Sequence, residues 1–299
     1  MGMTMSRYHL PKKTLAGLDL SAYSLDELKA LVRKILEDGL HGIAFSPYVD
    51  GQDNQTEVGI DQIRERMSIL APYVNWVRTF SCTRGNELSP KVAREQGLKS
   101  MVGVWLDDDF EHNEEEFQNG LSIVQAGEAD ILAIGNEVML RDEMSEDQLI
   151  DYINRAKAEA GGIPVGYVDA YFVFENHPRI AEACDVILVN LYPFWEGYPC
   201  EHAILYAKEM YRRSKVAARG KQVIIAETGW PNKGQAEGGS VPGYDNAVKY
   251  FLDVCKWVEE ENIDLFYFAG FDEEWKVAKE GDVGAYWGLW DKDGKLKYC

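Results

Sequence analysis

Short apolar segments recur along this chain at intervals of roughly 30 residues, and an amphipathic segment follows most of them. The apolar segments do not alternate strictly with polar residues, which is typical of strands buried on both faces of a parallel sheet. Strands are predicted at Gly42–Ser46, Trp76–Ser81, Ser100–Leu106, Ile131–Gly135, Pro164–Val168, Val186–Leu191, Val223–Ala226 and Leu265–Ala269. Helices are predicted at Ser24–Glu37, Gln62–Ala71, Glu114–Ala126, Ser145–Ala160, Glu201–Ala217 and Asp245–Glu260. The helix from Ser145 opens with a capping-box pattern, because Gln148 follows three residues later.

Eight strands with intervening helices predict an α/β fold of the (β/α)8 or TIM-barrel type, which needs roughly 250 residues. The whole chain, residues 1–299, is expected to form a single catalytic domain. Residues 1–39 would be an N-terminal segment and helix, and residues 40–299 the barrel with a short C-terminal hairpin that turns at Asp293-Gly294. A doubly wound open sheet is the alternative, since periodicity cannot show closure, but the chain has no G-x-G-x-x-G or Walker loop to support it.

The composition of the chain limits the classes of binding partner that are expected. The formal net charge is −19, which argues against nucleic acid because phosphate binding needs clustered Lys and Arg. No apolar run reaches the roughly 20 residues of a membrane-spanning helix, so no membrane partner is expected. An acidic protein suits a neutral substrate such as a plain glucan, although the simpler interpretation of the charge is solubility.

Metal and cofactor chemistry find no support in the sequence. The five cysteines are far apart, odd in number and form no C-x-x-C, so they predict neither a disulfide framework nor a zinc site. No H-x-H, H-E-x-x-H or G-x-S-x-G motif is present. The run Asp107-Asp108-Asp109 fits a solvated loop better than a cation site. No metal and no cofactor is therefore expected.

The start of the chain leaves the compartment open. Met1 to Thr14 has no apolar segment of the kind found in signal peptides. As written, the chain would be cytoplasmic, or else secreted or periplasmic if a leader has been removed.

Two glutamates stand where predicted strands end. Glu137 follows the fourth strand, and Glu227 follows the seventh. In a barrel, catalytic groups lie at these strand ends, and strands four and seven lie on opposite sides of the ring. Hydrolysis of a glycosidic bond needs one protonated and one ionised carboxyl group, about 5–5.5 Å apart in retaining enzymes. The alternative is that each glutamate merely complements a helix dipole, which two such placements together make less attractive.

The residues around these glutamates resemble glycoside hydrolase family 17, the β-1,3-glucanases and related glucan glucosyltransferases of the retaining barrel glycosidases. The resemblance rests on Gly135-Asn136-Glu137-Val138 and on Ala226-Glu227-Thr228-Gly229-Trp230-Pro231. It extends from about Gly42 to Trp290 through three further blocks: Val77-Arg78-Thr79-Phe80, Asn190-Leu191-Tyr192-Pro193-Phe194-Trp195 and Phe271-Asp272-Glu273-Glu274-Trp275-Lys276.

The resemblance implies a role for each matching residue. Glu137 would be the acid/base and Glu227 the nucleophile, while Asn136 would hydrogen-bond the sugar 2-hydroxyl and Tyr192 would hold Glu227. The remaining matching residues would contact substrate: Arg78, Asn190, Glu273 and Lys276. Two departures put subsite shape and the balance of hydrolysis and transfer in doubt, because Ser81 and Gly284 stand where many or several members carry an acid.

Aromatic residues near the predicted strand ends form a second signal, because aromatic rings stack on the apolar faces of sugars. Five are assigned to substrate binding: Trp105, Tyr171, Trp195, Trp230 and Trp275. Core or loop packing is the competing interpretation for any single one.

We therefore expect a retaining glycoside hydrolase that cleaves β-1,3-glucan of the laminarin type, as a monomer and with endo action preferred to exo action. A glucan glucosyltransferase using the same two glutamates is the alternative. A barrel that binds glucan without cleaving it, and a hydrolase for another β-glycan, remain further hypotheses.

Overall fold

A computed structural model describes residues 17–19 and 22–298, so Met1 to Thr14 and Cys299 lie outside the described residues. Parallel strands close into a barrel in the order β1 to β8, with Gly42 and Ile43 of β1 paired to Phe266 and Tyr267 of β8. The strands are β1 Leu40–Ala44, β2 Val74–Arg78, β3 Lys99–Val104, β4 Ile131–Asn136, β5 Val165–Ala170, β6 Val186–Asn190, β7 Val223–Thr228 and β8 Leu265–Tyr267. The predicted (β/α)8 barrel is confirmed, and the open doubly wound sheet is wrong because the sheet has no free edge.

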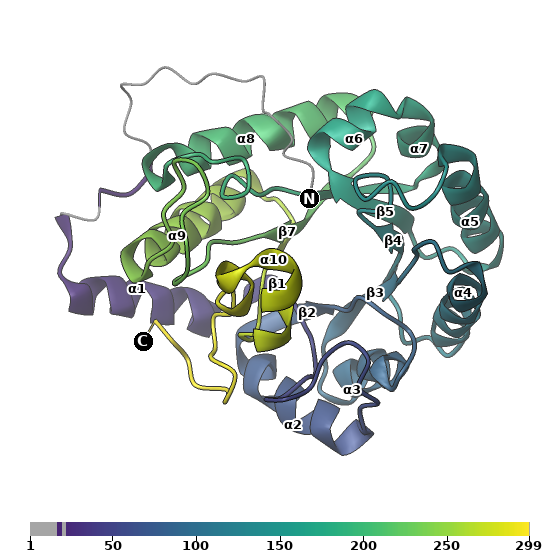
Figure 1. Ribbon diagram of the computed structural model, residues 1–299, viewed down its shortest axis with the longest axis horizontal. Helices are drawn as coiled ribbons and strands as arrows, with labels where there is room; N and C mark the ends of the chain where they lie inside the picture. Colours follow the sequence, from purple (N-terminus) through teal and green to yellow (C-terminus); the bar gives the residue numbers. More distant parts are fainter. Residues whose placement is uncertain (1–16, 20–21, 299) are drawn as a thin grey trace.

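Helices surround the ring of strands (Figure 1). They are α1 Leu25–Asp38, α2 Ile60–Leu70, α3 Ser89–Glu95, α4 Phe110–Gln125, α5 Glu146–Glu159, α6 Tyr171–Asn176, α7 Pro178–Ala183, α8 Cys200–Ala217, α9 Tyr244–Glu261 and α10 Val277–Glu280. The chain after β8 forms only short helical turns, and α1 lies between α9 and α2 on the outside of the ring (Figure 1). An N-terminal helix thus covers the strands that close the barrel.

Sequence periodicity found the long helices and missed the short ones. The capping box at Ser145 is confirmed, because its side chain accepts a hydrogen bond from the backbone of Gln148 and the Gln148 side chain accepts one in return. The three short helices α3, α6 and α7 are six or seven residues long, too short to show a repeating apolar face. Within the described ranges, no helix is long and apolar enough to cross a membrane.

Apolar side chains fill the barrel on both sides of its strands. One cluster occupies the interior and includes Met101, Ile131, Leu188 and Phe266, while a larger one packs between strands and helices. This double burial explains why the strands read as continuous apolar runs. At the end of the chain, Trp290 and Leu296 form an antiparallel bridge around the turn at Gly294, as expected for the short hairpin.

Candidate active site

The end of β4 has an irregular backbone. The pairing of β4 with β5 shifts register between Ala133 and Asn136, and Gly135 and Glu137 both have positive φ angles, 80° and 54°. A bulge of this kind changes the direction in which side chains point at a strand end. The Glu137 backbone N–H donates to the Val168 carbonyl at 2.8 Å, which fixes the turn against β5.

Glu227, on β7, is buried and accepts hydrogen bonds from two side chains. Its Oε1 accepts a hydrogen bond from Arg78 Nη1 at 2.5 Å, and its Oε2 accepts one from the Tyr192 hydroxyl at 2.6 Å. Arg78 ends β2 and is 2% exposed, so this is a buried ion pair. A cation and a phenol are the partners that an ionised carboxylate needs when it is removed from water.

Glu137 lies in a different environment. Its Oε1 accepts one hydrogen bond, from Asn190 Nδ2 at 2.8 Å. Burial raises the pKa of the Glu137 carboxyl, and the negative charge of Glu227 raises it further. The two glutamates therefore lie in different electrostatic environments, because the pKa of Glu137 is raised while Glu227 is paired with a cation.

Arg78 also joins the two glutamate strands. Its Nη2 donates to Asn136 Oδ1 at 2.8 Å, so a single guanidinium orients the residue before Glu137 and the carboxylate of Glu227. Arg141, in the turn after β4, donates to the backbone carbonyl of Asn136 and to that of Leu106. Its guanidinium lies over the Trp105 ring, with 4.6 Å between the carbon and the ring centroid. The ends of β2, β3, β4 and β7 are thereby linked by two arginines.

A second ion pair comes from the segment after β8. Lys276 Nζ lies 2.5 Å from Glu273 Oε2, and the Trp275 indole N–H donates to Glu273 Oε1 at 3.0 Å. Burial alone would lower the pKa of Lys276, but the charges of Glu273 and Glu280 together raise it. Lys276 also interacts with the charge of Glu227, so this pair belongs to the same electrostatic cluster.

A hollow of about 310 Å³ adjoins this pair between the loop after β1 and the segment after β8. It is lined by Tyr48, Asp50, Gln52, Glu273, Trp275 and Lys292, among others. The rings of Tyr48 and Trp275 meet edge to face with their centroids 6.0 Å apart. Aromatic surface beside carboxylate and amide groups suits a ligand that has both apolar faces and hydroxyl groups.

Comparison with known proteins now bears on this arrangement. A family model described as the BtgE/BtgC glycoside hydrolase domain matches residues 42–288. The chain belongs to this family. A curated relative, the glucan 1,3-β-glucosidase of Candida albicans, is 27% identical over 267 residues, which cover 81% of this chain and 84% of the relative.

Solved structures agree with the family assignment. A glycoside hydrolase family 17 β-1,3-glucanosyltransferase from Rhizomucor miehei is 29% identical, with a TM-score of 0.78 and with 87% of this chain and 96% of the other covered. An active-site mutant of the Rhizomucor enzyme in complex with laminaritriose gives a TM-score of 0.79 at the same identity and coverage. The resemblance to family 17 is confirmed, and this glycoside hydrolase has the barrel of its relatives.

Most residues singled out in the sequence of this glycosidase meet at the carboxyl ends of the strands. Contacts already described join Arg78, Asn136, Glu137, Asn190, Tyr192 and Glu227, and the Glu273–Lys276–Trp275 group lies beside them. Trp195 is half-buried, and its ring lies 5.5 Å from that of Trp287, which in turn packs edge to face on Tyr192. Trp105 stands at the end of β3 under Arg141.

Two of the predicted aromatic residues are not brought to this cluster. Tyr171 is 3% exposed because α6 begins at that residue, and its hydroxyl meets that of Tyr206 on α8 at 3.2 Å. Trp230 is 1% exposed, and its indole N–H donates to the Val241 carbonyl at 3.0 Å. Both rings pack between helices and loops, which is the competing interpretation that the sequence left open.

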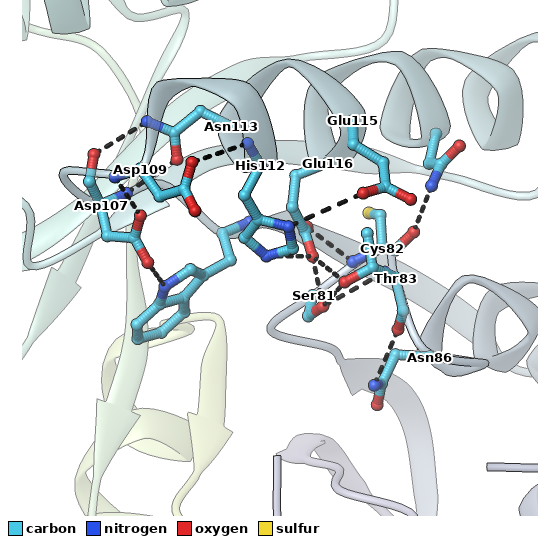
Figure 2. Close-up of polar contacts among 12 residues, drawn as sticks. Ser81, Cys82, Thr83, Asn86, Asp107, Asp109, His112, Asn113, Glu115 and Glu116 are labelled. Atoms are coloured by element: carbon cyan, nitrogen blue, oxygen red, sulfur yellow. Dashed lines mark hydrogen bonds and ion pairs between the residues drawn. The ribbon is translucent and has the colours of Figure 1, made fainter. Parts of the chain in front are cut away.

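Glu116 is a carboxylate that the sequence interpretation missed. It lies on α4 and is fully buried, and four groups donate to it: the Ser81 hydroxyl, Cys82 N at 2.7 Å, the Thr83 hydroxyl at 2.7 Å and Trp105 N at 3.0 Å (Figure 2). Ser81 is thus bonded to a carboxylate from a neighbouring helix. Glu116 lies on the same helix face as Phe117 and Leu121, all buried, so its position in the apolar repeat was the available signal.

The acidic run after β3 has structural partners. Asp107 accepts hydrogen bonds from the Trp105 indole at 3.1 Å and from Asp109 N at 2.9 Å. Asp109 is the N-cap of α4 and accepts from His112 N (Figure 2). These contacts make the run a turn and a helix cap.

Glu280 is the second missed residue. It ends α10, where Gly284 passes so close that a Cβ on this glycine would lie 2.9 Å from Glu280 Cβ. Burial raises the pKa of the Glu280 carboxyl to about 7, with Lys276 acting in the opposite direction and the charges of Glu273, Glu227 and Glu137 adding to the rise. A carboxyl group therefore stands next to Gly284, and a side chain at Gly284 would require Glu280 or the backbone of Lys276 to shift.

Proposed function

We propose that this chain cleaves β-1,3-glucan with retention, with Glu137 as acid/base and Glu227 as nucleophile. The observation that carries the proposal is the opposite environment of the two glutamates. Glu227 is paired with Arg78 and Tyr192, whereas the pKa of Glu137 is raised by burial and by Glu227. Retaining glycosidases need one carboxyl group in each state.

The contacts support a double displacement. The ionised Glu227 attacks the anomeric carbon while Glu137 gives its proton to the leaving glycosidic oxygen, which forms a covalent glycosyl-enzyme. Glu137, now ionised, then takes a proton from water, and the resulting attack releases the sugar from Glu227. Because Arg78 occupies the Oδ1 of Asn136, the amide N–H of Asn136 remains free to donate to the 2-hydroxyl of the sugar.

The substrate is proposed from the relatives and from the shape of the site. The Rhizomucor enzyme was solved with laminaritriose, and the Candida relative is named for glucan with β-1,3 linkages. The hollow lined by Glu273 and Trp275 offers space for further glucosyl units, and Glu273 is paired with Lys276, which interacts with the charge of Glu227. A neutral glucan also avoids the repulsion that the net charge of −19 would impose on an acidic polymer.

Laminari-oligosaccharides of defined length provide the test, with products resolved by size and by anomeric form. Shorter products released first as β-anomers are expected from the wild type. Glu227→Gln and Glu137→Gln should each lose several orders of magnitude in turnover, because each removes a group that the reaction needs. A variant at either position that keeps more than a tenth of the wild-type turnover contradicts the assignment.

Transfer is the second candidate function. The similarity to a β-1,3-glucanosyltransferase favours it, since a sugar hydroxyl that replaces water in the second step gives elongation with the same residues. Products longer than the substrate at high concentration would identify transfer, whereas shorter products at every concentration would identify hydrolysis.

The proposal also covers the domain organisation, the oligomeric state and the mode of cleavage. The whole chain is taken as one catalytic domain that acts as a monomer within glucan chains, without a nucleic acid or membrane partner. Light scattering of the active protein tests the monomer. Release of long fragments early in laminarin digestion tests endo action, because exo action would release only mono- or disaccharides.

A further inference from the structure

Two fully buried polar residues lie behind Glu137 on the neighbouring strand. Tyr167 and Asp169 both come from β5 and are 0% exposed. The Tyr167 hydroxyl donates to the Asp169 carboxylate and accepts a hydrogen bond from Met139 N at 2.9 Å. Asp169 also accepts from Ala170 N at 2.7 Å and from Leu140 N at 3.4 Å. The pair thus binds two consecutive backbone N–H groups of the turn that follows Glu137.

This turn needs external support. Glu137 has a φ of 54°, in the left-handed region that costs a residue with a side chain about 1–2 kcal/mol. Within the turn, Arg141 N donates to the Glu137 carbonyl at 2.9 Å, but the N–H groups of residues 139 and 140 point to β5. The Tyr167 ring also lies behind Gly135, where a Cβ would be 3.4 Å from Tyr167 Cε2. The backbone that carries Glu137 therefore rests on Tyr167 and Asp169 from behind.

Asp169 also acts on Glu137 through its charge. Burial raises the pKa of Asp169 to about 7, and the charge of Glu137 is the next largest cause. Repulsion between two negative charges is reciprocal, so an ionised Asp169 favours the protonated form of Glu137. Three donors converge on the Asp169 carboxylate, namely the Tyr167 hydroxyl and two backbone N–H groups, and their hydrogen bonds act against the rise in its pKa.

We propose that Tyr167 and Asp169 are positioning residues for the acid/base step: they hold the left-handed turn that presents Glu137, and the carboxyl group of Asp169 stands behind it. The inference rests on the proposed role of Glu137. Neither residue needs to touch the substrate, since both act through the turn and through the Glu137 carboxyl.

Other charged and titratable groups face the same carboxyl groups and enter any pH profile. Those that interact with Glu137 come from β2, the turn after β4, the segment after β6, β7 and α10: Arg78, Arg141, Tyr192, Glu227 and Glu280. Asp169 faces Tyr167 on its own strand and Glu137 on β4. Of these groups, only Asp169 is bonded to the turn and carries a charge that a neutral isostere can remove.

The experiment compares Asp169→Asn and Tyr167→Phe with the wild type on two substrates across the pH range. A laminari-oligosaccharide needs a proton on its leaving oxygen, whereas an aryl β-laminaribioside with a strongly acidic phenol does not. In Asp169→Asn, the alkaline limb of kcat/KM on the oligosaccharide should move to lower pH by roughly half to one unit, because this limb reports the acid of the free enzyme. kcat/KM on the aryl substrate should stay within about threefold, since that step needs no acid.

Tyr167→Phe removes a hydrogen bond that holds the turn after Glu137 but leaves the carboxyl group of Asp169 in place, so it tests the support of the turn separately from the effect of charge. It should lower kcat on the oligosaccharide roughly tenfold at all pH values with little change in KM, because the acid is misplaced while the binding groups are untouched. Tyr211→Phe and Asp253→Asn are matched controls, a buried tyrosine that donates to the Val223 carbonyl at the start of β7 and a buried aspartate on α9. Both controls should lose stability without moving the alkaline limb.

The possible outcomes distinguish a failure of the proposed function from a failure of the proposed positioning role. If the wild type cleaves no β-1,3 substrate, the proposed function is wrong. If the wild type is active, Glu137→Gln is not, and folded Asp169→Asn keeps the alkaline limb within 0.2 pH unit, the positioning role is wrong and the function stands. Equal losses on both substrates would also overturn it, since a general structural defect affects the aryl substrate too. Should Asp169→Asn not fold, the ratio of the two substrates in Tyr167→Phe decides alone.

Discussion

Replacement of Arg78 tests whether its guanidinium creates the different electrostatic environments of Glu137 and Glu227. Arg78→Met removes the hydrogen bonds to Glu227 and Asn136 and leaves a methylene stem of similar bulk. Hydrogen bonds to charged groups contribute about 1.5–3 kcal/mol each. Loss of one such bond from the step in which Glu227 attacks corresponds to a fall in kcat/KM of roughly 10- to 150-fold.

The pH profile gives a more specific result than the rate. Arg78 lowers the pKa of the Glu137 carboxyl, against the larger rise caused by burial and by the charge of Glu227. The alkaline limb of kcat/KM, which reports the acid of the free enzyme, should therefore move to higher pH in Arg78→Met.

Stability must be measured alongside activity. Removing one partner of a buried ion pair costs about 3–5 kcal/mol, or roughly 6–20 °C in Tm for a protein of this size. Arg66→Met is the matched control, because Arg66 is also buried, at 4% exposure, but donates to the Lys292 carbonyl. It should lower Tm without moving either limb.

The reasoning would be refuted if folded Arg78→Met kept kcat/KM within threefold and its alkaline limb within 0.3 pH unit of the wild type. Arg78→Lys distinguishes charge from geometry. Its ammonium keeps a cation near the two glutamates but cannot bridge Glu227 and Asn136 as a planar guanidinium does. The alkaline limb should stay close to that of the wild type while the rate falls.

Three further predictions address other parts of the site. Because the pKa of Glu280 is raised from 4.5 to about 7, the folded state loses stability as pH rises from about 4.5 to 7, and the loss is complete above 7. Glu280→Gln should therefore raise stability by about 1–2 kcal/mol at pH 8 and not at pH 4 in chemical denaturation. Glu116→Leu should cost more than about 3 kcal/mol, since four donors lose their acceptor, whereas Glu116→Gln should cost less than about 1.5 because its amide can match two N–H donors and two hydroxyls; a similar Tm for both would contradict this. Gln52→Ala should lower kcat/KM on laminaripentaose about threefold or more and leave laminaritriose unaffected, and an equal effect on both lengths would exclude the hollow as a remote subsite.

The strand ends could be predicted because apolar periodicity breaks there. The polar residues that follow the fourth and seventh apolar runs, Glu137 and Glu227, have no place in a core strand without a partner. Arg78 falls inside the strand predicted at Trp76–Ser81, so the resemblance identified it and the strand end did not. What periodicity could not predict is the register shift at Ala133 and Asn136, because it depends on pairing with β5.

The aromatic residues show where spacing stops being informative. Trp230 and Trp195 both follow strands at positions typical of a cleft, yet one is 1% exposed and the other half-buried. The direction of a ring at a strand end depends on the loop and the helix that follow. At Tyr171 the helix begins at once, which turns the ring toward α8.

Glu116 and Glu280 reach the site from helices, which a search restricted to strand ends overlooks. Glu116 lies in a run of three glutamates, and the apolar repeat of α4 was the one signal that set it apart from the other two. Glu280 ends a helix of four residues that has no periodicity to detect. Its position becomes visible only when tertiary contacts bring α10 to the strand ends.

The excess of carboxyl groups over cations gives the site its chemical character. Near the strand ends, the described residues include the cations of Arg78, Arg141 and Lys276 and a larger set of carboxyl groups: Glu137, Asp169, Glu227, Glu273 and Glu280. Two carboxylates are bonded directly to cations, Glu227 to Arg78 and Glu273 to Lys276, and the other three are those with raised pKa values. Each further ionisation among these three works against a negative charge already present, so protons leave one at a time. Under the proposed mechanism, such a site supplies an acid at Glu137 beside the carboxylate that Arg78 holds at Glu227, which is the pair that a retaining glycosidase needs.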